Sequence, residues 1–402
     1  MAKLTTLDDL KAAQATIASV IRPNLSRRSD WLSSMINREV WIKPEQLQRT
    51  GSYKIRGATN HMSKLPAGSR VVAASAGNHA QGVAYGAKKL GFKSTVFMPA
   101  TASLPKVAAT RGYGADVELV GATVEDAIEA AQKFAAKHHA HYVPPFDDAL
   151  VIAGQGTVGL EILSEIGKTA LEYVVVPVGG GGLISGVAAA IKLTNPNIGV
   201  IGVQAEGAAS MRAALDAGHI VTLPRIGTIA DGIAVKTSGI LNFSHAQQFV
   251  DDVVTVSDNE ISSALVLLLE RAKVVVEPAG AVGVAALLAG KIPGVGAVAT
   301  ITSGGNIDPL LLMKIIEQGL SASGRYSTIR VTLVDRPGQL VKLATAFFEL
   351  GLNVIEIDYH RRGLNLLLNE VEIRVTVETR GLEHQATVIP ALVAKGFTAT
   401  EA

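Results

Sequence analysis

The chain has 402 residues, of which 48% are hydrophobic and 18% charged, a composition that excludes a disordered or fibrous protein. Its 37 basic and 35 acidic residues give a net charge of only +2, without a basic run, so we expect no nucleic-acid partner. The absence of cysteine excludes disulfides, thiolate metal sites and cysteine nucleophiles, and is compatible with the cytoplasmic location that we expect. The length predicts two or three folded units.

The beginning of the chain predicts an ordinary first helix. The segment MAKLTTLDDLKAAQATIASVI is amphipathic and contains acids, unlike the apolar core of a signal peptide. The longest weakly polar run, 278–290, has 13 residues and is too short to cross a bilayer. We therefore expect no membrane segment.

From about residue 70 to 330, short apolar runs alternate with helical patterns. Examples are RVVAAS before HAQGVAYGAKKLG, and YVVVPV before LISGVAAAIKL. This repeated order predicts an α/β fold with parallel strands and crossover helices. The runs VVVPV and VGVIGVQA are continuously apolar, which predicts strands buried on both faces.

The last part of the chain has a different pattern. The small and polar segment SASGRYS, 321–327, predicts a linker. After it, the sequence predicts a strand, a helix, two strands, a helix and a short last strand, which is the ferredoxin-like βαββαβ order. Apolar and polar residues alternate in NVIEIDY and EVEIRVTVE, as expected for a sheet with one covered face.

Ligands of open parallel sheets bind at the carboxyl ends of the strands. There, GGGG at 179–182 precedes a helix expected to begin at Leu183, and its backbone N–H groups and the helix dipole suit a phosphate. A dinucleotide site is an alternative, with Glu206 as the ribose acid, but no register satisfies G-x-G-x-x-G. A flexible loop without a ligand is another.

Three further stretches bring polar groups to the same region. In SAGNHAQG, we expect Ser75 and Asn78 to cap the following helix and nearby amides to bind a carboxylate, although capping alone also explains the pattern. In TSGGNID, Ser303 would project its hydroxyl into the crevice or cap a helix. Glu277 lies among apolar residues, either as a perturbed acid or as the partner of a local donor.

The segment GSYKIRGA, 51–58, places Lys54 between Tyr53 and Arg56. Such a lysine is either a surface residue or an amine nucleophile. Together with a phosphate loop, a carboxylate site and a hydroxyl, it outlines a pyridoxal phosphate site. Because free lysine has a pKa of about 10.4, we expect desolvation or a nearby cation such as Arg56 to lower it.

These motifs, in this order, resemble the threonine dehydratase and serine/threonine ammonia-lyase group of fold type II pyridoxal-phosphate enzymes over about residues 15–320. The tail, with VTLVDRPGQLVKLATAF and NVIEIDY, resembles an ACT regulatory domain. The resemblance implies two open, twisted, mostly parallel sheets with helices on both faces in a catalytic domain at 1–322. A smaller subdomain at about 50–150 would be inserted in it, and the ACT domain would occupy 325–402.

The resemblance also implies roles for single residues. Lys54 would form the Schiff base with pyridoxal 5'-phosphate beside Tyr53, Asn78 would bind the ring hydroxyl oxygen, and Ser303 would lie beside the pyridine nitrogen. The expected phosphate cradle consists of Gly179, Gly180, Gly181, Gly182 and Leu183. The expected receptors of the substrate carboxylate are Ser75, Ala76, Gly77 and His79, of which Ser75 also counts with Lys54 as catalytic.

The implied activity is the dehydration of threonine and serine, with release of ammonia and a 2-oxo acid, 2-oxobutanoate from threonine. A hydroxyl at Ser303 does not hold the pyridine nitrogen protonated, which favours elimination over transamination. Related serine racemases carry a proton-donating serine where this chain has Ala76, which disfavours racemisation. The alternatives are a serine racemase, a 3-hydroxyaspartate dehydratase, or an amino-acid-binding sensor with weak catalysis.

For the tail, the resemblance implies an amino-acid effector near Asp335, Gly338, Leu340 and Asn353, whereas the alternative is a dimerisation module without effector. We expect a homo-oligomer, a tetramer or a dimer. We expect no essential metal, because Arg212 stands where some relatives carry a second acid after Glu206.

Overall fold

The computed structural model describes residues 3–167, 169–361 and 366–402. The chain divides into two compact units, Met1–Pro309 and Leu310–Ala402. The linker predicted at 321–327 is wrong, because a helix continues to Ala322 and a strand already begins at Tyr326. Small residues do not interrupt this helix, and Gly324 with a φ of +66° turns the chain after it. The domain limits 1–322 and 325–402 stay a prediction.

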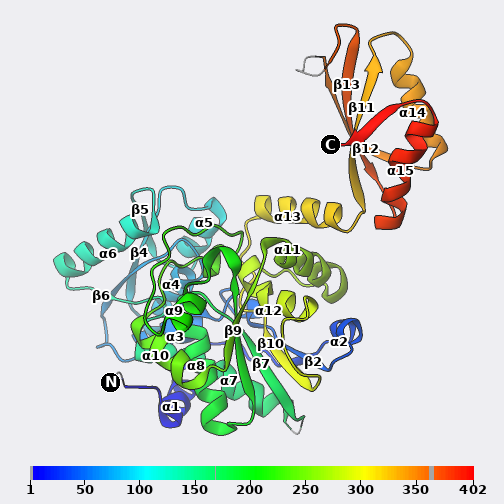
Figure 1. The fold of residues 1–402 in the computed structure, drawn as a ribbon. Helices are drawn as coiled ribbons and strands as arrows, with labels where there is room; N and C mark the ends of the chain where they lie inside the picture. Colours follow the sequence, from blue (N-terminus) through cyan, green and yellow to red (C-terminus); the bar gives the residue numbers. More distant parts are fainter. Residues whose placement is uncertain (1–2, 168, 362–365) are drawn as a thin grey trace. The chain divides into compact units, whose positions relative to one another are not determined.

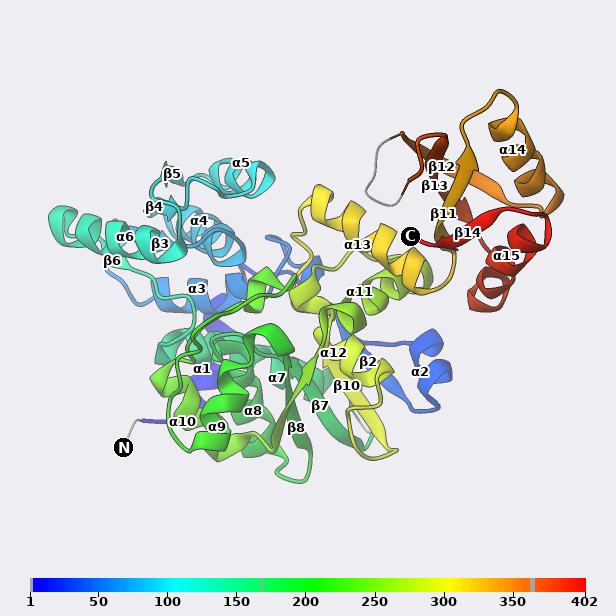
Figure 2. The same ribbon diagram turned by 45° about the horizontal axis from the view of Figure 1, so that its top comes forward.

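The first unit contains a large sheet whose strands are parallel, except for one edge pair (Figures 1 and 2). In spatial order within the described residues, it consists of β1 (Arg27–Arg28), β2 (Val40–Lys43), β10 (Ala297–Ile301), β7 (Leu171–Pro177), β8 (Gly199–Ala205) and β9 (Asp252–Val256). Strands β7 and β8 are largely buried, as their apolar sequences predict.

A small, wholly parallel sheet occupies the same unit. Its described strands, in spatial order, are β5 (Asp116–Leu119), β4 (Lys93–Met98), β3 (Arg70–Ala74) and β6 (His141–Tyr142). All of them lie between β2 and β7 in the sequence, so the small sheet is inserted between two parts of the large one. The α/β fold class with two mostly parallel sheets is thus confirmed.

Helices connect these strands in the predicted order, and the expected first helix is α1. The described helices of the first unit are α1 (Leu7–Ile17), α2 (Asp30–Ile36), α3 (Lys54–Met62), α4 (Asn78–Leu90), α5 (Leu104–Gly112), α6 (Val124–His138), α7 (Ala149–Ile166), α8 (Gly182–Thr194), α9 (Ser210–Ala217), α10 (Ile240–Phe249), α11 (Asp258–Leu267) and α12 (Pro278–Leu288). Short helical turns are η1 (Glu45–Leu47), η2 (Glu206–Ala208), η3 (Asp231–Ile233) and η4 (Leu268–Ala272).

Helices α3, α7 and α8 pack at backbone distance through glycines. A Cβ atom on Gly154 of α7 would lie 2.7 Å from the Cα atom of Gly57 in α3. A Cβ atom on Gly186 of α8 would lie 2.4 Å from the backbone nitrogen of Gly156 in α7. Both distances are too short for any side chain, so glycine alone permits these crossings. The first turn of α3 therefore lies directly against α7, which in turn lies against α8.

Helix α7 is long and apolar enough to cross a membrane by length and composition. However, 61% of its apolar window is buried inside the unit, where α7 packs against α1, α3 and α8. Such burial is typical of a core helix.

The second unit begins with α13 (Pro309–Ala322) and then has the predicted βαββαβ order. Its described elements are β11 (Tyr326–Val334), α14 (Gln339–Glu349), β12 (Asn353–His360), β13 (Glu370–Glu378), α15 (Leu382–Ala394) and β14 (Thr398–Glu401). The strands form an antiparallel tail sheet in the order β12-β13-β11-β14, and both α14 and α15 lie on one side of it (Figures 1 and 2).

The predicted one-sided burial is found in β11 and β13, where every second residue is buried. It is wrong for β12, most of whose residues are exposed. The reason is its position: β12 is an edge strand, and its register with β13 shifts between Val354 and Glu356, which is typical of a bulge. The alternation of apolar and polar residues therefore did not predict the burial of a strand at the edge of the sheet.

A buried network of charges anchors the start of α3. The guanidinium of Arg56, which is 0% exposed, contacts both oxygens of Glu45 at 2.7 and 2.8 Å and both oxygens of Glu161 at the same two distances. The buried ammonium of Lys43 contacts Glu161 at 2.8 Å and Glu165 at 2.7 Å. The network therefore joins β2, η1, α3 and α7.

Replacement of Arg56 by methionine should destabilise the first unit by about 3–5 kcal/mol, because Glu45 would remain as a buried charge without its partner. The exposed ion pair of Arg28 with Asp30 supplies the control, for which Arg28→Met should cost less than about 1 kcal/mol. The shift of the urea unfolding midpoint measures both effects. Equal shifts for the two variants would contradict the importance of the buried network.

Candidate active site

Lys54 is the first residue of α3, and its side chain contacts Pro145 and the ring of the preceding Tyr53. Its Nζ atom donates to the carbonyl oxygen of Pro145 at 2.7 Å and lies 5.4 Å from the ring centroid of Tyr53. The backbone nitrogen of Tyr53 donates to the carbonyl oxygen of Ser303 at 3.1 Å. The structure thus brings together Lys54, Tyr53 and Ser303, and the lysine is not a surface residue.

Desolvation controls the charge of this lysine. Burial lowers the pKa of Lys54 from its ordinary 10.5 to about 8, against the negative charge of Glu277, which raises it. The prediction that burial depresses this pKa is confirmed. The suggested contribution of Arg56 is wrong, because its guanidinium is turned into the buried network with Glu45 and Glu161.

The glycine loop is shaped by the residues packed behind it. A Cβ atom on Gly180 would lie 2.6 Å from the ring of Phe146, so no larger residue fits. The carbonyl oxygen of Gly180 accepts hydrogen bonds of 3.1 Å from the backbone nitrogen of Gly239 and from Nδ2 of Asn242. Because C=O and N–H point in opposite directions across a trans peptide, the N–H of Gly181 points away from these donors.

The same loop opens helix α8. Gly181 is its N-cap with a φ of +104°, and among the described residues no side chain caps the helix. The first N–H groups of α8, including that of the buried Leu183, therefore suit an anion. The helix begins at Gly182, one residue before the predicted start. Gly179 completes the loop beside Ile233.

The loop 75–77 does not cap α4 as predicted. Gly77 is the N-cap, and Oγ of Ser75 accepts from its backbone nitrogen at 3.1 Å. Asn78 is the first residue of the helix and directs its side chain elsewhere. The side-chain oxygens that would otherwise cap the helix thus accept from other donors, the backbone nitrogen of Gly77 and Nδ2 of Asn306. The loop of Ser75, Ala76 and Gly77 is partly exposed, and α4 begins directly behind it.

The amide of Asn78 is held at both ends. Its Nδ2 atom donates to Oε1 of Glu277 at 2.6 Å, and its Oδ1 atom accepts from Nδ2 of Asn306 at 2.8 Å. These contacts fix the orientation of the amide and leave its second N–H for another acceptor. This geometry fits the role expected for Asn78 toward a ring oxygen. Asn306 was not among the predicted site residues, although it lies in the motif TSGGNID.

Glu277 accepts a hydrogen bond from Asn78, and its pKa is shifted. Both roles suggested by its sequence position, the partner of a local donor and an acid with a shifted pKa, therefore apply. Burial and the negative charge of Asp231 raise the pKa of Glu277 to about 7, while Lys106, Asn78 and Lys54 lower it. Its backbone nitrogen donates to the carbonyl oxygen of Gly304 at 3.0 Å. A carboxyl group and an amine that both titrate near neutral pH are typical of functional sites.

Ser303 and His79, two further residues of the expected site, are buried as well. Ser303 is 3% exposed in the loop after β10. The Nε2 atom of His79 lies 2.8 Å from the carbonyl oxygen of Val143, and burial together with the charge of Lys54 lowers the pKa of His79 to about 3. Its imidazole is therefore neutral near pH 7 and donates to Val143. A role of His79 toward the substrate stays a prediction.

Three of the four expected effector residues share the turn from β11 to α14, whereas the fourth, Asn353, lies apart from them within one chain. Asp335 follows the end of β11 and lies 3.4 Å from the hydroxyl of Tyr359, and Gly338 is the N-cap of α14 just before the half-exposed Leu340. Asn353 lies opposite Glu378 of β13. Tyr326 at the start of β11 is opposite Glu378 too, so Asn353 lies at the other end of the tail sheet from Asp335. Effector binding at these residues stays a prediction.

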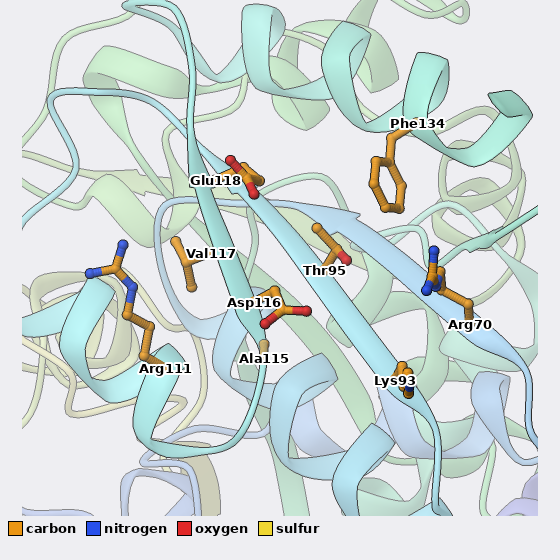
Figure 3. Close-up of a pocket in the computed structure, with 9 residues that line it drawn as sticks. All are labelled: Arg70, Lys93, Thr95, Arg111, Ala115, Asp116, Val117, Glu118 and Phe134. Atoms are coloured by element: carbon orange, nitrogen blue, oxygen red, sulfur yellow. The ribbon is translucent and has the colours of Figure 1, made fainter. Parts of the chain in front are cut away.

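An open hollow of about 440 Å³ lies on the small sheet (Figure 3). Its lining includes Arg70, Lys93 and Asp116, which are the first residues of β3, β4 and β5. Ligands of parallel sheets bind at the opposite, carboxyl ends. The hollow is therefore separate from the candidate active site.

No group of three or more His, Asp or Glu side chains that could hold a metal ion occurs in the part of the chain that the structure describes. Glu206 lies 3.9 Å from Lys291, and Arg212 pairs with Asp216 and Asp252. The expectation of no essential metal stays a prediction.

Comparison with known proteins decides the family. Residues 17–304 match the family described as "Pyridoxal-phosphate dependent enzyme". The chain belongs to this family. The resemblance found in its motifs is confirmed, and the cofactor of the family is the one that the sequence predicted. The family's members use pyridoxal 5'-phosphate, and the glycine cradle, the amine of Lys54 and the oriented amide of Asn78 fit that group.

Similar proteins include three informative members of the family. An L-threonine ammonia-lyase of Thermotoga maritima is 46% identical over 398 residues, which cover 98% of each chain. A threonine deaminase from T.th. has a solved structure with a TM-score of 0.73 at 40% identity, covering 75% of this chain and 99% of that one. Maize serine racemase has a TM-score of 0.74 at 33% identity, covering 80% and 99%.

The reactivity of Lys54 should follow its lowered pKa. In competitive labelling of the cofactor-free chain with acetic anhydride, the midpoint for Lys54 should lie at about pH 8. The exposed Lys133 supplies an internal standard for the reagent. Glu277→Gln should move the midpoint below 8, because the negative charge of Glu277 raises this pKa. A midpoint near the ordinary 10.5 would show that Lys54 is not desolvated.

Proposed function

We propose that the chain is a pyridoxal-phosphate-dependent threonine dehydratase that also accepts serine and converts threonine to 2-oxobutanoate and ammonia. The observation that carries this proposal is the amine of Lys54, desolvated at the start of α3 and joined to the glycine cradle by the segment of Pro145 and Phe146. Support for the substrate comes from the L-threonine ammonia-lyase that is 46% identical over 98% of both chains. A buried amine with a lowered pKa suits a nucleophile, and this disfavours the alternative of an amino-acid sensor with weak catalysis.

When bound, the cofactor supplies an aldehyde for the amine of Lys54 and an electron sink for the substrate's α carbon. The glycine loop and the first turn of α8 would hold its phosphate by backbone N–H groups. Asn78, oriented by Glu277 and Asn306, would donate its remaining N–H to the ring oxygen. Ser303 would offer a hydroxyl to the pyridine nitrogen.

The chain's own residues would then divide the work on the substrate. The loop of Ser75 to Gly77 and the N-terminus of α4 would receive the carboxylate by their N–H groups. Lys54, with a pKa of about 8, would take the α-proton near neutral pH at Nζ. Ala76 offers no proton on the opposite side, which favours elimination over racemisation.

Full-length protein with pyridoxal 5'-phosphate should release 2-oxobutanoate from L-threonine faster than it forms D-serine from L-serine. A panel of threonine, serine and 3-hydroxyaspartate, followed by 2-oxo acid release and chiral chromatography, measures this order. Lys54→Ala should lower kcat by about 10³-fold or more, because the α-proton loses its acceptor. Racemisation of serine faster than threonine dehydration would favour a serine racemase.

Regulation by an amino-acid effector in the second unit is part of the proposal. The turn from β11 to α14 offers the carboxylate of Asp335, and at Gly338, with a φ of +89°, the backbone is open to approach because a Cβ atom there would contact nothing within 4 Å. Asn353 lies at the other end of the same sheet, so a site that includes it would need a second copy of the chain. The proposal rests on the βαββαβ fold and these groups.

Isoleucine or valine should change the KM for threonine of the full-length enzyme by about fivefold or more if the turn binds an effector coupled to catalysis. Asp335→Ala should abolish that change while leaving kcat without effector unaltered. The exposed Glu349, which pairs with Lys395, supplies the control variant Glu349→Ala. No response to isoleucine, valine or added threonine would favour a dimerisation module.

We further propose a cytoplasmic homo-oligomer, with a tetramer preferred to a dimer. The family likeness and the absence of cysteine support this part of the proposal.

A further inference from the structure

An ion pair beside the site takes no part in the proposed reaction. Nζ of Lys106 in α5 lies 2.5 Å from Oδ2 of Asp231 in η3. Helix α5 packs on the small sheet, whereas η3 lies between β8 and β9 in the chain and contacts α12, so the pair joins the two halves of the unit. The side chain of Lys106 is 14% exposed and that of Asp231 53% exposed. Lys106 is therefore the inner partner.

The surroundings of the pair place it at the candidate substrate position. A Cβ atom on Gly77 would lie 3.9 Å from Nζ of Lys106, so the ammonium stands over the loop expected to receive the carboxylate. A Cβ atom on Gly232 would lie 3.6 Å from Oε1 of Glu277. Ile233 packs on Gly179, the first residue of the glycine loop. The pair thus lies between the carboxylate loop and the phosphate loop.

At this position the positive charge of Lys106 is already neutralised by a partner, and a further acid lies nearby. Lys106 is already paired with Asp231, while Glu277 adds a second acid whose electrostatic neighbours include both. An amino acid with a hydroxyl on its β carbon needs no counter-charge there. A second carboxylate would meet the acids Asp231 and Glu277 beside the ammonium of Lys106, which is already paired. Like charges at close range are a common basis for rejecting a wrong partner.

We propose that the Lys106–Asp231 pair determines the substrate range of the enzyme. Asp231 holds the ammonium that would otherwise bind a second carboxylate, and so restricts the site to amino acids with an uncharged β-substituent. This inference rests on the proposed dehydratase function, since it names the class of substrate that the same site accepts.

Asp231→Asn tests the proposal with little change in shape. It removes the carboxylate that contacts the mostly buried Lys106, and an anionic substrate can take the place of that carboxylate. The ratio of kcat/KM for 3-hydroxyaspartate to kcat/KM for threonine should rise about tenfold or more. The matched control Asp216→Asn removes a carboxylate that pairs with Arg212, and should leave the ratio unchanged. Adding Lys106→Met to Asp231→Asn should return the ratio to its original value.

A binding measurement separates this inference from the proposed function. In calorimetric titration of the holoenzyme with malate, a dicarboxylate without an amine, Asp231→Asn should bind about tenfold more tightly than the wild type. The double variant with Lys106→Met should lose that gain. Equal affinity of wild type and Asp231→Asn would overturn the inference. A wild-type enzyme that releases no 2-oxobutanoate from threonine would instead overturn the proposed function, whatever the malate result.

Discussion

The burial of Arg56 between Glu45 and Glu161 is the constraint on which the site depends. A guanidinium without exposure is tolerable only where carboxylates replace its water, and here two of them do so from η1 and α7. The first turn of α3 is thereby fixed to both elements. Lys54 lies two residues earlier on that turn, and a backbone hydrogen bond from Tyr53 to Ser303 ties the same turn to the end of β10. The position of the Lys54 amine thus follows from the buried charge network and from backbone contacts of the same turn.

Electrostatics then gives the site its chemistry. Burial lowers the pKa of Lys54 to about 8 and raises that of Glu277 to about 7, so an amine and a carboxyl group approach each other in acidity. Such convergence is expected where proton transfer takes place near neutral pH. Asn78 contacts the carboxyl group directly and is oriented by it. The orientation of the amide and the shifted pKa values of Glu277 and Lys54 are therefore parts of one polar network.

Much of this could be predicted from the sequence because the relevant signals are local. Apolar runs followed by glycine-rich turns and helices indicated the parallel strands and the glycine loop, and the motif GSYKIRGA indicated Lys54. The rest depends on side-chain direction and on distant partners: Asn78 and Glu277 are 199 positions apart, and Lys106 and Asp231 are 125 apart. No local pattern contains such pairs. For the same reason two predictions from the sequence were wrong: that Arg56 lowers the pKa of Lys54, and that the edge strand β12 is buried on one face.

The glycine crossing of α3 and α7 has a mechanical consequence. With Gly57 and Gly154 at backbone distance, the two helices have little room to move there, and the buried Gln155 of α7 accepts from the backbone nitrogen of Gly57 at 3.2 Å. The crossing therefore resists sliding of one helix along the other. The halves of the unit also meet through α5, by polar contacts that water can replace, such as the hydrogen bond from Ser103 to Asp308. A small rocking of the small sheet about this crossing would move α5 most and the amine of Lys54, which lies beside the crossing, least.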